Sequence, residues 1–441
     1  MKYLLNLFFI LTVLVSLNHC TNQTANENSD ADTEITVQQT YIDEVGDLTG
    51  NERIQQALAH IEEVDEFTVR NQIMITEIPA PPFLEQLRAT KYAEMMTELG
   101  LEQVRIDDEG NVIGVRPGTE GDRNIVISAH LDTVFPEETD VEVEVRNDTL
   151  FAPGITDDTR GLTALLTLID TYETLEISTR DNIWFVGTVG EEGVGDLRGV
   201  KHLFETEGDN IDAFISIDGS SDSRIVNQAL GSHRYRVTFE GPGGHSWGAF
   251  GIGNPAHAIG RAIAIFEDKA SEFVKTGPRT SYNVGRIGGG TSVNSVPFEN
   301  WMEIDMRSES QESLKQIDAL MHEAIDEALR EANSIKTEGP DLTVNVEMIG
   351  NRPSGTIESS TPLIQRALAV TEHFGDEPDL ARSSTDSNVS ISMGIPSMTI
   401  GGGGSSGGSH SLDEWWFNNE GYKGIQRAFL ILTAEAGIAD K

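Results

Sequence analysis

The chain has 441 residues, 38% of them hydrophobic, which is enough for a folded core in one large or two medium domains and excludes wholesale disorder. Its 72 acidic and 31 basic residues give a formal net charge of −41, which would repel nucleic acid and excludes a DNA- or RNA-binding function. Abundant carboxylate with scarce lysine predicts adaptation to concentrated salt, the alternative being an acidic exported protein without salt dependence.

The start of the chain predicts export. Met1-Lys2 precedes an uncharged apolar run over 4–17, which is too short to cross a bilayer because a spanning helix needs about 20 residues. The single cysteine, Cys20, follows this run and resembles the lipid-anchored cysteine of bacterial lipoproteins; cleaved secretion and an uncleaved anchor are the alternatives. We predict a signal peptide over 1–20, a polar tether over 21–45, and a periplasmic or membrane-anchored protein.

Short apolar strands then alternate with helices. Helical spacing predicts helices over 51–78 and 83–99, and a further helix over 161–175. Three β-branched apolar runs are typical of strands buried on both faces, and they cover 124–128, 182–189 and 213–217. This alternation predicts an α/β sheet with helices on both faces.

The pattern changes near residue 232, where two amphipathic helices occur among alternating strands. The predicted elements are strands over 233–240, 282–287, 301–307 and 341–348 and helices over 255–270 and 313–334. The α/β pattern then returns with elements over 361–374, 397–400 and 419–436. We therefore predict a catalytic domain in two parts, 46–231 and 350–441, interrupted by an inserted α+β domain at 232–349.

Histidines and carboxylates follow the predicted strands where each strand ends. They are His130, Asp132, Asp157, Glu191, Glu192, Asp218 and His410. Ligands of open α/β sheets bind at this edge. Each residue alone has a structural explanation: Asp157-Asp158 as a helix cap, or His410 bonded to Glu414. Together, however, the carboxylates would repel one another unless a cation lay among them.

The donor set indicates the kind of metal. Two imidazoles and several carboxylates, with no thiolate, favour zinc, cobalt or manganese. The number of oxygen donors suits two metal ions bridged by one carboxylate. A free carboxylate beside the ligands serves as general base, and the adjacent Glu191 and Glu192 offer this division of roles.

The motifs resemble, in this order, the dizinc metallohydrolase family of peptidase T, bacterial glutamate carboxypeptidase, acetylornithine deacetylase, succinyl-diaminopimelate desuccinylase and aminoacylase. The segments that carry the resemblance are Ala129–Asp132, Gly154–Asp158, Gly190–Gly193, Asp218, Gly243–His245, Gly288–Gly290 with Asn294, Asp305–Arg307, Ser384–Asp386 and Ser409-His410. The family implies a zinc exopeptidase-like mixed sheet covered by helices on both faces, and an inserted lid that also mediates dimerisation.

The resemblance implies a role for each metal-site residue. Asp157 would bridge two ions, His130 and Asp218 would complete one site, and Glu192 and His410 would complete the other. Glu191 would be the general base, and Asp132 would orient the ring of His130. The family often has a cis peptide after the bridging carboxylate, here between Asp157 and Asp158.

The resemblance also implies substrate-binding groups. His245 would stabilise the oxyanion, often from the partner subunit of a homodimer. Asn294 and Arg307 would hold the substrate's carboxylate, assisted by the backbone of Gly402 and Gly403, which lie in a glycine-rich run predicted to bring backbone close to a ligand.

These expectations favour a dizinc exopeptidase that cleaves small peptides with a free terminal carboxylate. The stretch 190–199 (GEEGVGDLRG) resembles the peptidase members of the family. One alternative is an N-acyl-amino-acid deacylase of the same family. Another is a non-catalytic, surface-anchored binding lipoprotein, which would have no reason to keep Glu191.

Overall fold

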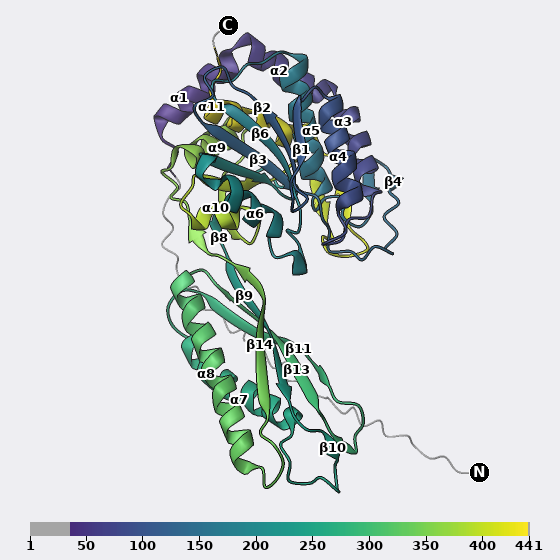
Figure 1. The fold of residues 1–441 in the computed structure, drawn as a ribbon. Helices are drawn as coiled ribbons and strands as arrows, with labels where there is room; N and C mark the ends of the chain where they lie inside the picture. The colour runs from purple at the N-terminus through teal and green to yellow at the C-terminus, as the bar shows by residue number, and fades with distance from the viewer. Residues whose placement is uncertain (1–35, 440–441) are drawn as a thin grey trace, which may run out of the picture. The chain divides into compact units, whose positions relative to one another are not determined.

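A computed structural model describes residues 36–439, which contain two large sheets with separate hydrophobic cores (Figure 1). The predicted signal peptide, Cys20 and most of the predicted tether lie outside the described residues. Among the residues that are described, no helix is long and apolar enough to cross a membrane.

The first helices differ from those predicted. Helix α1 (Gln39–Gly50) begins inside the segment assigned to the tether, and the helix predicted over 51–78 is two helices, α2 (Glu52–Glu63) and α3 (Asp65–Thr76). The polar composition of α1 conceals an apolar stripe of Tyr41, Val45 and Leu48, which packs on the main core. The side chain of Asn51 caps α2 and so separates it from α1.

The larger sheet has nine strands and mixes parallel and antiparallel pairs. Its order is β1-β2-β6-β3-β7-β17-β8-β15, with β16 beside β8. The strands are β1 (Gln103–Ile106), β2 (Val112–Arg116), β3 (Asn124–His130), β6 (Asn182–Thr188), β7 (Ala213–Ile217), β8 (Arg224–Ala229), β15 (Gly355–Thr356), β16 (Asp379–Ser383) and β17 (Ser397–Ile400). Strand β3 is parallel to both β6 and β7, so the carboxyl ends of these three strands meet at one edge.

Helices cover both faces of this sheet. Along β3, Ile125 and Ile127 enter one core while Val126 enters another, because successive side chains point to opposite faces. The first face is covered by α4 (Gln86–Glu98), α5 (Thr159–Thr174), α9 (Pro362–His373) and α11 (Tyr422–Ala436), and the second by α6 (Arg198–Glu207) and α10 (Ser387–Ser392). The predicted fold class is confirmed.

A small sheet borders the same edge. It has the order β18-β19-β5-β4 and is antiparallel throughout. Its strands are β4 (Glu144–Arg146), β5 (Thr149–Phe151), β18 (Ser405–Gly407) and β19 (Trp415–Phe417). The glycine-rich run therefore ends in a strand, and β19 follows His410 closely.

The second large sheet is antiparallel, with the order β11-β13-β9-β14. Its strands are β9 (Gly231–Glu240), β11 (Thr280–Gly289), β13 (Glu299–Ser308) and β14 (Thr343–Arg352), accompanied by a short pair, β10 (Gly244–His245) and β12 (Ser295–Val296). Helices α7 (Pro255–Phe273) and α8 (Gln311–Ile335) pack on one face and form a core of their own (Figure 1). This is the predicted inserted α+β unit; the exact limits 232–349 stay a prediction.

Strands β9 and β14 join the inserted unit to the larger sheet. The chain enters the inserted unit from β8 into β9 and returns to the larger sheet from β14 into β15, which pairs with β8. At this junction Arg352 of β14 is paired with Ser232 of β9.

Candidate metal centre

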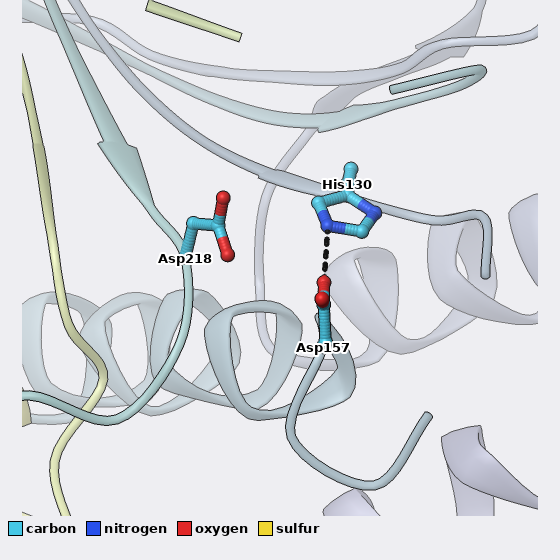
Figure 2. A group of neighbouring side chains, drawn as sticks. All are labelled: His130, Asp157 and Asp218. Atoms are coloured by element: carbon cyan, nitrogen blue, oxygen red, sulfur yellow. Dashed lines mark hydrogen bonds and ion pairs between the residues drawn. The ribbon is translucent and has the colours of Figure 1, made fainter. Parts of the chain in front are cut away.

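His130, Asp157 and Asp218 lie together at the carboxyl edge of the larger sheet (Figure 2). His130 ends β3, Asp218 follows β7, and Asp157 lies in the loop before α5. The Nε2 atom of His130 is 2.9 Å from Oδ1 of Asp157, and one candidate ligand atom from each of the three residues lies within 4.8 Å of the others. Such a cluster can hold a divalent ion.

A second group shares the same aspartate. Oδ2 of Asp157 is 3.0 Å from Nε2 of His410, and that nitrogen is 2.8 Å from Oε1 of Glu192. These three residues also offer ligand atoms within 4.8 Å of one another. Asp157 thus directs one oxygen to each group, which is the geometry of a carboxylate that bridges two metal ions.

The electrostatics of these residues favour a bound cation. Burial and, after it, the neighbouring Asp157 carboxylate raise the pKa of Asp218 to about 7. Burial opposes ionisation of Asp157 too, but hydrogen bonds from His130 and His410 hold its pKa well below the usual range. Closely packed carboxylates of this kind lose their mutual repulsion when a divalent ion lies between them.

The ring of His130 is oriented for ligation. Its Nδ1 lies 3.0 Å from the backbone carbonyl oxygen of Asp132, which can only accept a hydrogen bond. Nδ1 therefore carries a proton, and Nε2 is the ring nitrogen turned toward Asp157, where it would ligate a metal ion. The resemblance assigned this orienting role to the Asp132 carboxylate, but its nearest oxygen is 3.7 Å from Nδ1.

The Asp132 carboxylate also binds the backbone of the two glutamates. Its Oδ1 accepts the backbone N–H of Glu191 at 3.0 Å, and its Oδ2 accepts that of Glu192 at 2.8 Å. Burial raises the pKa of Asp132, but His130 and these two N–H donors outweigh burial and lower it. Asp132 therefore fixes the backbone that carries both glutamates.

Glu414 holds the Asp157 loop, a role that was not predicted from the sequence. Its buried carboxylate accepts the backbone N–H groups of Gly154, Thr156 and Asp157 at 2.9–3.1 Å. The alternative in which Glu414 bonds His410 is wrong, because the contacts of His410 go to Asp157 and Glu192. The only sequence signal was an acidic residue beside two tryptophans, a setting in which a carboxylate needs hydrogen-bond donors.

The helix-cap explanation applies to Asp158 and leaves Asp157 available. Asp158 is buried, and its side chain accepts the N–H of Gly161 in the first turn of α5 and that of His130. The peptide bond between Asp157 and Asp158 is cis, as the resemblance implied.

Arg352 is a second residue that sequence analysis missed. Its Nη1 donates to Oε1 of Glu191 at 2.8 Å and to Oγ of Ser384 at 3.0 Å, and its Nη2 donates to the backbone carbonyl of Glu191. Burial raises the pKa of Glu191 well above its ordinary value, and the Arg352 charge opposes that rise. Glu191 also belongs to a candidate group with His130 and Glu192.

The residues predicted to contact substrate from the inserted unit lie elsewhere. His245 is exposed in β10, and the Asn294 carbonyl accepts the N–H of Ser246 next to it. β10 follows the end of β9 that is remote from the junction with β8. Arg307, in β13, is held by Asp305, whose Oδ2 is 2.9 Å from its Nε. Among the described residues, none of the three belongs to the candidate metal groups.

Gly402 and Gly403 were expected to offer backbone groups to a ligand, and both backbone polar groups of Gly402 have partners within the protein. Its N–H donates to Gly219, and its carbonyl accepts from buried Arg160. A Cβ on Gly403 would lie 2.2 Å from the carbonyl oxygen of Gly421, and φ there is +85°. These glycines are explained by close backbone packing against the start of α11.

Comparison with known proteins identifies the family. Residues 126–433 match the family model described as Peptidase family M20/M25/M40. The chain belongs to this family. A curated relative is the uncharacterized protein YqjE of Bacillus subtilis, 27% identical over 307 residues that cover 66% of this chain and 76% of that protein.

Solved structures share the fold. Aminopeptidase PepT from Bacillus cereus has a TM-score of 0.66 and 23% identity, covering 84% of this chain and 99% of that one. A tripeptidase from Staphylococcus aureus has a TM-score of 0.66 and 21% identity, covering 83% and 98%. Human carnosine dipeptidase 1 has a TM-score of 0.67 and 14% identity, covering 87% and 100%. Family membership confirms the predicted enzyme class, a metallopeptidase-type hydrolase.

Proposed function

We propose that this M20 family member is a dimetal exopeptidase that hydrolyses small peptides with a free terminal carboxylate. The observation that carries the proposal is the placement of Asp157 between two ligand groups, with His130 and Asp218 on one side and Glu192 and His410 on the other. The nitrogen and oxygen donors fit two zinc ions, with cobalt or manganese as the other fitting metals.

The metal ions, when bound, supply Lewis acidity that polarises the scissile carbonyl and acidifies water. Glu191 is proposed as the general base that takes the proton of the attacking water and passes it to the leaving amine. Asp132 supports this role by holding the backbone N–H of Glu191. His410 is the exposed member of the candidate groups, and we propose that substrate approaches from its side.

Substrate recognition is proposed to involve the inserted unit. Because β10 follows the end of β9 that is remote from the junction with β8, we propose that His245 reaches the scissile bond of a partner subunit in a homodimer. Arg307, oriented by Asp305, would bind the terminal carboxylate of the substrate, with Asn294 beside it.

The test of the proposed function is metal content and turnover of the chain without residues 1–20 in high-salt buffer, assayed with tripeptides and acetyl-amino acids. Two metal ions per chain and chelator-sensitive tripeptide hydrolysis are expected. Preference for acetyl-amino acids would replace the exopeptidase by a deacylase of the same family. Absence of tight metal and of turnover in metal-supplemented buffer would contradict the enzyme and favour a binding lipoprotein.

Arg307→Ala is expected to lower kcat/KM by about 100-fold, because a charged hydrogen bond to a carboxylate contributes about 1.5–3 kcal/mol. The effect should fall mainly on KM, and it should be smaller for substrates whose terminal carboxylate is amidated. Initial rates on a tripeptide and its amide measure both. Equal kcat/KM for variant and wild type on the free-acid peptide would remove Arg307 from the binding site.

Export and lipid anchoring are proposed from the apolar run and Cys20 alone. Full-length protein expressed in a bacterial host should sediment with membranes. Cys20→Ala should shift it to the soluble fraction, because the single cysteine that would carry the lipid is then missing. Immunoblots of the fractions measure this, and Ser16→Ala within the apolar run serves as the control variant. Equal membrane association of Cys20→Ala and wild type would favour an uncleaved anchor.

A further inference from the structure

Glu191 is held at two points by a single guanidinium. Arg352 bonds the side-chain oxygen Oε1 at 2.8 Å through Nη1 and the backbone carbonyl of the same residue through Nη2. Both side chains are buried, with 6% and 7% of their surface exposed. With Oε1 and the carbonyl bound to one rigid, planar group, the glutamate side chain keeps little rotational freedom.

The acidic residues around Glu191 explain why its contact with Arg352 is needed. Glu191 is next to Glu192, and Asp386 lies near Arg352, so the carboxylate of Glu191 is repelled from this region without the guanidinium. The Oγ atom of Ser384 accepts a hydrogen bond from the same Nη1 at 3.0 Å and so also holds the Arg352 side chain. The buried atoms Arg352 Nε and Asp386 Oδ1 have no hydrogen-bond partner among the described residues.

Arg352 comes from the junction between the two units. It is the last residue of β14, paired with Ser232 of β9, whereas Glu191 follows β6 of the larger sheet. The contact therefore makes the orientation of Glu191 depend on where the inserted unit is attached.

We propose that Arg352 is a positioning residue for the reaction: it fixes Oε1 of Glu191 so that the other carboxylate oxygen is directed to the attacking water. This inference rests on the proposed function of Glu191 as general base. Arg352 is not proposed to contact substrate, and the substrate carboxylate is assigned to Arg307. A displacement of a reacting group by about 1 Å can lower a rate about 100-fold.

Three variants test the role. Arg352→Ala should lower kcat on a tripeptide about 100-fold with KM within about threefold and metal content unchanged. Arg352→Lys restores the charge but cannot hold two points in one plane, so kcat should be about tenfold below wild type. Ser384→Ala should lower kcat about threefold, and it should have no further effect in the Arg352→Ala background, because both act through one contact.

A matched control separates positioning from stability. Arg366 in α9 is also partly buried and paired with two carboxylates, Glu44 and Glu435, away from the metal groups. Arg366→Lys should leave kcat and KM within about twofold of wild type, even if the midpoint temperature of its thermal unfolding changes. If Arg352→Ala does not fold, the kinetics of Arg352→Lys and Ser384→Ala test the positioning role.

The possible results are distinct. Wild-type kcat in both Arg352→Lys and Ser384→Ala overturns the inference. An effect confined to KM also overturns it, as does a decrease in kcat that equals the fraction of unfolded protein in the variant. A loss of metal with activity also overturns it, because Arg352 would then support ligation. Absence of turnover by the metal-loaded wild type overturns the proposed function and the inference together.

Discussion

Glu191→Gln should lower kcat by about 1,000-fold while both metal ions stay bound. Glutamine keeps the size of glutamate and can still accept the hydrogen bond of Arg352 through its amide oxygen, but it cannot take a proton from water. General bases contribute about 10²–10⁴-fold to rate, and the expected loss lies in this range. KM should change little, since Glu191 does not bind the proposed substrate carboxylate.

The measurement is single-substrate kinetics on a tripeptide, with metal content per chain from the same preparation. Glu173→Gln is the control, because Glu173 is also paired with an arginine, Arg116, but lies outside the candidate groups. Loss of one metal ion from Glu191→Gln would identify Glu191 as a ligand. Undiminished turnover would place the general base elsewhere. The presence of Glu191 would then no longer argue against a non-catalytic binding protein.

The fold was predictable where the hydrophobic pattern was unambiguous. Strand β7 over Ala213–Ile217 was predicted with its observed bounds, because five consecutive apolar or small residues between polar ends are too short for a helix and typical of a strand covered on both faces. Helix α8 was found with ends two residues or fewer from those predicted, since its apolar stripe is long. Helix α1 and the short strands were missed, because their packing residues are few and separated by polar ones.

The candidate metal residues were predictable because chemistry-bearing side chains followed strands whose ends must meet. The parallel pairing of β3 and β7 brings His130 and Asp218 to one edge, and Asp157 reaches them from the loop before α5. Glu414 and Arg352 were not predictable in this way. Their roles depend on hydrogen bonds to backbone groups and to Glu191, and these contacts leave no spacing pattern in the sequence.

The predicted effect on metal binding is greatest for Asp157→Ala, which should reduce bound metal from two ions per chain to fewer than one. Asp157 directs Oδ1 toward His130 and Oδ2 toward His410, so its removal takes a ligand from both groups at once. Loss of a group that merely supports a ligand weakens metal binding about 10–100-fold, and loss of a shared ligand should exceed this. Chelator-sensitive turnover should disappear with the metal.

Metal analysis after dialysis against metal-free buffer measures the loss without relying on activity. Asp170→Ala is a close control, because Asp170 lies in α5 and also bonds the Nε2 of a histidine, His60, at 2.7 Å, but it belongs to none of the candidate groups. Two ions in Asp170→Ala and fewer than one in Asp157→Ala would show that the loss is specific to the shared carboxylate. One tightly bound ion in Asp157→Ala would mean that the two groups bind independently, and Asp157 would then not bridge them.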